Sequence, residues 1–150
     1  MKTLLYLSLL IGVFWSAFGL LLLIGYSLLG YVSPLLNDFF NVTVRTSKWF
    51  LAFSLFSLCS GLCTCLYSIA RASGGNHMIF LSFAFASSAF SIAVQIYRMV
   101  VSGLGWFAVD LLGAYGDLRP IQLLSIGLLI LSLILFSFQF SLIRLERTRL

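Results

Sequence analysis

Side chains able to do chemistry are few in this sequence, and they do not form a catalytic set. The single histidine, His77, lies in a short polar stretch, with no acidic cluster near enough in sequence to complete a metal site. The cysteines Cys59, Cys63 and Cys65 do not form a C-x-x-C motif. We therefore expect His77 to be a solvated turn residue, the cysteines to be buried free thiols, and the protein to carry no cofactor or metal.

Two motifs are candidate modification sites. Cys63 and Cys65 lie near the end of an apolar run that we expect to reach the cytosol, where S-palmitoylation is the alternative to a purely apolar role. Asn41-Val42-Thr43 is a glycosylation sequon, so Asn41 is a candidate glycan acceptor if its loop is lumenal or extracellular.

The apolar runs contain no ionisable residue at their centres, although such residues commonly mark ion and proton pathways. Gln95 and Gln139 are the strongest polar groups there, suited either to interhelical hydrogen bonds or to a transported solute. Arg98 and Asp110 lie at the edge of the apolar runs, where a glycine-rich segment can bring them together. This pair either fixes that segment or receives a lipid headgroup or an ion.

The composition identifies the environment that positions these groups. Of the 150 residues, 61% are hydrophobic and 9% are charged, whereas about 25% charge is usual in soluble domains. Mean hydropathy is +1.11. The nine basic residues lie at segment ends and form no continuous basic surface, so we expect a lipid bilayer as partner and no nucleic acid.

Four long apolar runs predict an all-α membrane protein, because open-ended strands cannot span lipid. We expect one domain, residues 1–150, built as a left-handed four-helix transmembrane bundle with short loops. The predicted spans are residues 4–32, 49–70, 78–97 and 121–143, with Ser33-Pro34 ending the first. Residues 99–119 hold four glycines and are expected to form an interfacial or a re-entrant segment.

An even number of spans places both termini on one side of the membrane. That side would carry five basic residues against four on the other, which favours cytosolic termini in a multi-pass protein. The expected location is either the plasma membrane or an endomembrane.

Small and polar residues recur along one face of each span, as in helices that pack closely in lipid. The spacing predicts the following packing residues: Ser8, Gly12, Ser16, Ser54, Ser57, Gly61, Thr64, Ser68, Ala84, Ser88, Ser125, Ser132 and Gln139.

The layout resembles tetraspan proteins in general, but it lacks both the loop motif of claudins and the Cys-Cys-Gly motif of tetraspanins. We expect a non-catalytic accessory or assembly subunit that packs against another integral membrane protein or a second copy of itself. The alternative is a small oligomeric channel or transporter. A third reading, an enzyme acting on lipid, would need Arg98, Asp110 or Asp117 at a headgroup-facing pocket.

Overall fold

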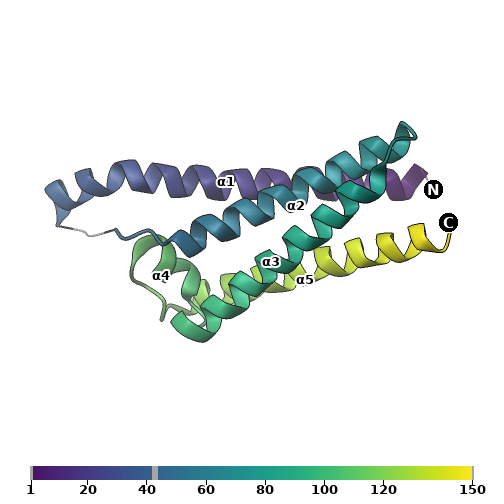
Figure 1. Cartoon of the computed structure of the whole chain (residues 1–150). Helices are drawn as coiled ribbons and strands as arrows, with labels where there is room; N and C mark the ends of the chain where they lie inside the picture. The colour runs from purple at the N-terminus through teal and green to yellow at the C-terminus, as the bar shows by residue number, and fades with distance from the viewer. Residues whose placement is uncertain (1, 42–43, 150) are drawn as a thin grey trace.

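The regular structure of this protein is entirely helical. The computed structural model describes residues 2–41 and 44–149, and in them five helices follow one another (Figure 1). These are α1 (Lys2–Phe40), α2 (Lys48–Ala72), α3 (His77–Ser102), α4 (Trp106–Leu112) and α5 (Arg119–Arg147). All but α4 are long and apolar enough to cross a membrane. The predicted all-α class with four long apolar helices is confirmed.

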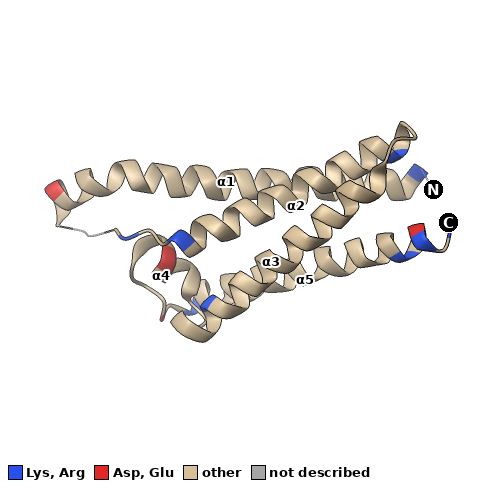
Figure 2. Cartoon of the chain, viewed as in Figure 1, with Lys and Arg blue, Asp and Glu red and all other residues tan. Residues whose placement is uncertain are grey.

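The four long helices pack in sequence, α1 on α2, α2 on α3 and α3 on α5, and both termini lie at the same end (Figure 1). We call that end the terminal pole (residues 2–5, 70–78 and 143–149). The opposite end, which includes α4, is the loop pole (residues 37–50 and 98–121). Charged residues are confined to these two ends (Figure 2).

The first helix is longer than the sequence pattern predicts. It continues through Pro34 to Phe40 instead of ending at Ser33-Pro34. Proline removes one backbone donor but does not prevent the helical dihedrals of the residues after it, and Pro34 lies on the exposed surface where its ring has space. At 1.5 Å per residue, the 39 residues of α1 extend about 58 Å.

Glycine allows α1 and α2 to approach until their backbones touch. A Cβ added at Gly61 would lie 2.3 Å from the backbone nitrogen of Ser16, and one at Gly12 would lie 2.8 Å from that of Cys65. Farther toward the loop pole in the same contact between α1 and α2, a Cβ at Gly19 would lie 2.6 Å from the backbone nitrogen of Leu58. No side chain fits at these points, so the sequence requires glycine there.

Candidate functional site

Polar side chains line the interior of the bundle and bond to one another across helices. Two pairs of serine hydroxyls join α2 to α3, with Ser57 and Ser91 3.2 Å apart and Ser60 and Ser88 2.5 Å apart. All four side chains are buried. Together with the two glutamines described next and their partners Thr64 and Ser132, they form what we call the polar column (Ser57, Ser60, Thr64, Ser88, Ser91, Gln95, Ser132, Gln139).

Two glutamines connect α5 to this column. The Gln139 amide nitrogen donates to the hydroxyls of Ser60 at 3.0 Å and Thr64 at 3.1 Å on α2. The Gln95 amide nitrogen on α3 donates to the Ser132 hydroxyl on α5 at 2.7 Å. Both glutamines are fully buried, so their amides hold α5 against the other helices through hydrogen bonds.

Each glutamine also carries an oxygen without a partner. Within residues 2–41 and 44–149, the side-chain oxygens of Gln95 and Gln139 and the indole nitrogen of Trp106 are buried and accept or donate no hydrogen bond. Burying an unpaired polar group costs about 1–3 kcal/mol. Among the described residues, the column therefore keeps two strong acceptors without donors in the interior of the bundle.

At the loop pole, Arg98 and Asp110 form the ion pair that the sequence suggested. Nε of Arg98 donates to Oδ2 of Asp110 at 2.7 Å, and Nη2 donates to Oδ1 at 2.5 Å. Nη2 also donates to the hydroxyl of Ser102. The carboxylate is 2% exposed, and the Asp110 backbone oxygen accepts from the Ser47 backbone nitrogen at 2.7 Å. Asp110 thus joins α4 to α3 and to the start of α2.

The short helix α4 is held there by aromatic packing as well. Trp106 is fully buried, with its ring centroid 5.4 Å from that of Phe53 at nearly a right angle. Phe107 contacts Phe50 edge to face at 5.1 Å. The segment predicted as residues 99–119 is shorter in the structure, because α3 continues to Ser102 and α5 begins at Arg119. Between them lies the seven-residue α4, which is bounded by Gly105 and Gly113 and covers the end of the bundle (Figure 1).

At the terminal pole, Glu146 is the centre of a second polar cluster. Its Oε1 accepts from the Tyr67 hydroxyl at 3.0 Å and lies 3.1 Å from Nε of Arg71. Its Oε2 lies 3.4 Å from Nε2 of His77. We call Tyr67, Arg71, His77 and Glu146 the terminal cluster, and it joins α2, α3 and α5.

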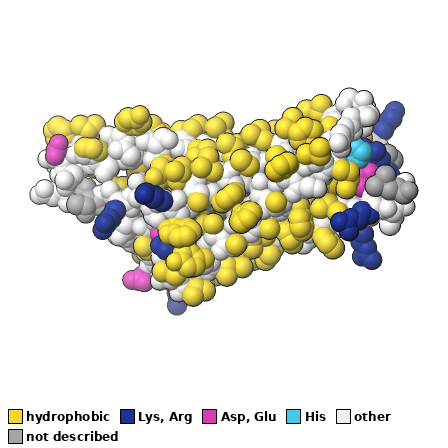
Figure 3. All heavy atoms as spheres, viewed as in Figure 1, with side chains coloured by type: hydrophobic (Ala, Val, Ile, Leu, Met, Phe, Trp, Pro, Cys, Tyr) yellow, Lys and Arg dark blue, Asp and Glu magenta, His cyan; other side chains and the backbone are white. Residues whose placement is uncertain are grey.

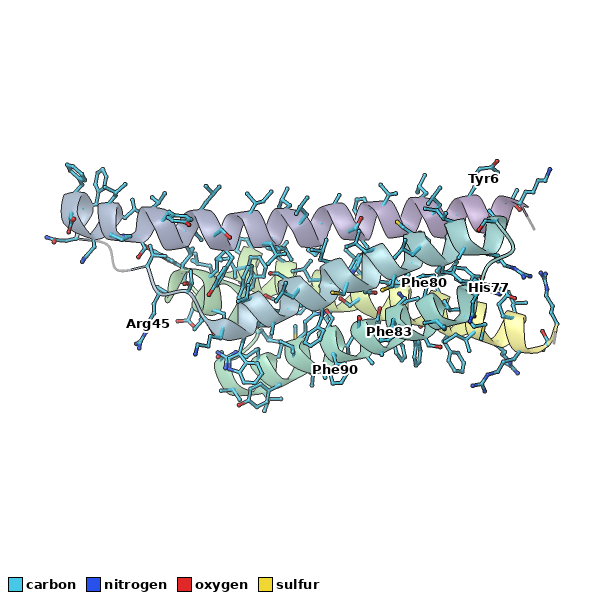
Figure 4. All side chains as sticks on the ribbon, turned by 45° about the horizontal axis from the view of Figure 1, so that its top comes forward. Tyr6, Arg45, His77, Phe80, Phe83 and Phe90 are labelled. Atoms are coloured by element: carbon cyan, nitrogen blue, oxygen red, sulfur yellow. The ribbon has the colours of Figure 1, made fainter. Side chains whose placement is uncertain are left out.

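This cluster corrects one prediction and adds a residue that sequence reasoning missed. His77 is not a solvated turn residue: its side chain is 18% exposed and faces Glu146. Figure 4 shows it at the start of α3 beside the C-terminal end of α5. Sequence reasoning missed Glu146 because it lies in a basic tail. It continues the seven-residue spacing of Ser125, Ser132 and Gln139, and this spacing indicates that Glu146 lies on the same face of α5 as they do.

Other predicted packing residues are buried or, for Ser16, half-buried, and they make different contacts. The hydroxyls of Ser8 and Ser68 bond across α1 and α2 at 2.7 Å. Ala84 is fully buried on α3. Three serines instead donate to backbone oxygens of their own helix, as expected for hydroxyls within a helix: Ser16, Ser54 and Ser125.

Among the described residues, the cysteines and the sequon residue take no part in the hydrogen bonds and ion pairs of the two charged clusters. Cys59 is exposed, which corrects the expectation of a buried thiol, and Cys63 is half-buried. The Cys65 sulfur lies 3.9 Å from the backbone oxygen of Leu9, within the contact between α1 and α2. Asn41 is exposed directly after α1, and the other two positions of the sequon, 42 and 43, lie outside the described residues.

Similarity gives no further guide to the role of these clusters. Comparisons of the chain with protein-family models, with curated proteins and with solved structures found no match. In the part of the chain that the structure describes, no group of three or more His, Cys, Asp and Glu side chains could hold a metal ion.

Proposed function

We propose that this protein is a non-catalytic subunit of a membrane complex, inserted through α1, α2, α3 and α5 as a left-handed bundle with cytosolic termini. In this proposal it acts by packing against another integral membrane protein. The observation that carries the proposal is the outer part of α1, residues 27–40, which we call the α1 extension.

The α1 extension projects past the other long helices. The Tyr26 ring stacks on that of Phe50, two residues after α2 begins, so residues 27–40 continue beyond the start of α2 (Figure 1). Fourteen helical residues extend about 21 Å. The whole of α1, at about 58 Å, is nearly twice the roughly 30 Å thickness of the hydrocarbon core.

This extension exposes large aromatic side chains beside its polar residues Asn37 and Asp38. Tyr31 is 81% exposed, Phe39 78% and Phe40 71%. Figure 3 shows hydrophobic side chains continuing along the bundle to this end. Lys48 and Arg119 begin α2 and α5, and Arg98 lies in the last turns of α3, so these basic residues indicate where the headgroups start. Large apolar side chains exposed beyond that level are typical of a protein contact.

Glycines support the same assignment. Gly12, Gly19 and Gly61 are explained by the contact between α1 and α2, whereas a Cβ added at Gly25 or Gly30 would meet nothing within 4 Å. A helical glycine with no close neighbour costs about 1 kcal/mol relative to alanine. Gly30 lies in the α1 extension and Gly25 just before it. A partner helix lying against α1 from Gly25 outward would give these two glycines the role that Gly61 has inside the bundle.

Site-specific photo-crosslinking tests this proposal. Benzoylphenylalanine placed at Tyr31 or Phe39 of the full chain, in intact cells, should give one adduct of defined mass that withstands membrane washing. The same probe at Phe83, an aromatic residue on α3 with 62% exposure, is the matched control and should contact lipid only (Figure 4). An adduct of twice the chain mass would identify the partner as a second copy. Equal labelling at all three positions would refute a specific contact.

The polar column favours a second candidate, a small oligomeric channel or transporter. It extends between two charged clusters and holds unpaired Gln95 and Gln139 oxygens, which are acceptors for water or a cation. The purified chain in liposomes should then pass protons or potassium ions, and Gln139→Leu should slow the flux. Flux equal to that of empty liposomes would remove this candidate and leave the accessory role.

A further inference from the structure

A small cavity at the terminal pole has the residues that an anion-binding site needs. Such a site would not depend on the accessory role proposed above. Its volume is about 130 Å³, and it is lined by Arg71, His77, Met78, Glu146 and Arg149. These residues come from the end of α2, the start of α3, and the end of α5 with the turn after it. The cavity therefore exists only because the three helices meet.

The carboxylate in this cavity is already occupied by protein donors. Both oxygens of Glu146 face partners, Oε1 facing Tyr67 and Arg71 and Oε2 facing His77. Its charge is thereby compensated within the terminal cluster. Among the described residues, Arg71 reaches Glu146 through Nε, so its two Nη groups keep donors for another acceptor.

The surroundings add positive charge. The terminal pole carries five basic side chains, Lys2, Arg71, Arg144, Arg147 and Arg149, against the single carboxylate of Glu146, which is a side-chain charge of +4 with His77 neutral. The space-filling view shows Lys, Arg and His gathered at this end around the acidic side chain (Figure 3). Arginine pairs well with phosphate because its planar donors match two phosphate oxygens.

We propose that this cavity binds a phosphate group, with Arg71 and Arg149 as the pairing cations. The phosphate belongs either to an anionic lipid headgroup or to a free phosphate ion, since both present the same oxygens. A lipid suits the position at the end of three candidate spans, where basic pockets between helices receive headgroups. Met78 gives the cavity an apolar wall on the side of α3.

Native mass spectrometry of the full chain in micelles tests the lipid source. The chain should retain phosphatidylglycerol in preference to phosphatidylcholine, because the choline of the second lipid neutralises its own phosphate whereas phosphatidylglycerol keeps a net negative charge for the arginines. Arg149→Gln and Arg71→Gln should each weaken phosphatidylglycerol binding about fivefold, the effect expected for one basic residue near an anionic surface. Arg147→Gln is the matched control, because Arg147 is exposed on the same segment and does not line the cavity.

A second arm tests the free ion. Inorganic phosphate added to the chain in phosphatidylcholine micelles should raise its melting temperature, and Arg149→Gln should abolish that rise, if the source is soluble. Either arm supports the site. Equal retention of the two lipids with no effect of phosphate overturns it, and so does an equal loss of binding in Arg147→Gln and Arg149→Gln. Should Arg71→Gln fail to fold, Arg149→Gln decides, because Arg149 lies past the end of α5.

Discussion

Replacing Gly61 by alanine should force α1 away from α2, because the new methyl group meets backbone. An ideal Cβ at Gly61 lies 2.3 Å from the Ser16 nitrogen and 2.7 Å from the Ser16 Cα, whereas ordinary contact begins at 3.4 Å. The helices must separate by roughly 1 Å, and overpacking of this kind costs about 1–3 kcal/mol. The separation also strains the 2.7 Å bond between Ser8 and Ser68, worth roughly 0.6 kcal/mol among membrane helices.

Gly25→Ala is the matched control, since it makes the same chemical change on α1 where a Cβ meets nothing within 4 Å. Both substitutions gain up to about 1 kcal/mol of helix propensity, so the difference between them isolates the clash. We expect Gly61→Ala to be less stable than Gly25→Ala by about 2–3 kcal/mol. Unfolding of the purified chain in mixed micelles with increasing dodecyl sulfate measures both. Equal midpoints for the two variants would refute the close contact between α1 and α2.

Three further changes probe the polar groups. Asp110→Asn should destabilise the chain by about 2–3 kcal/mol, because the Arg98 side chain, which is 12% exposed, loses its charge partner. The control Asp117→Asn, on the exposed surface, should change stability by less than about 0.5 kcal/mol in the same unfolding assay. A double-mutant cycle of Gln139→Leu with Thr64→Val should give a coupling energy of about 0.6 kcal/mol, and zero coupling would contradict the 3.1 Å bond. Glu146→Ala should speed tryptic cleavage after Arg144 about fivefold, since the last turn of α5 loses contacts worth about 1 kcal/mol. The control Ser141→Ala, which removes an exposed hydroxyl of the same helix, should leave the cleavage rate unchanged.

The periodic features of the chain were predictable from the sequence. Four apolar runs indicated the four long helices, and the spacing of Ser8 and Gly12 on one run and of Gly61 and Ser68 on another indicated faces that the structure brings into contact. Helix periodicity places such residues on one stripe, and only small side chains allow close approach. The ends of the helices were harder to predict. Proline statistics favoured a helix end at Pro34, yet the loss of one backbone donor did not end α1 there.

The two charged clusters mark where sequence reasoning reaches its limit. Arg98 and Asp110 were predictable as a pair because they are only twelve positions apart, with Gly103 and Gly105 between them. Glu146 and Tyr67 are 79 residues apart, and no local pattern relates them. By itself, the sequence determined that the chain is helical, apolar and charged only at its ends, since composition and period express local physics. Which serine meets which glutamine, and that Glu146 joins three helices, was decided by the tertiary structure, because those contacts depend on how the helices cross.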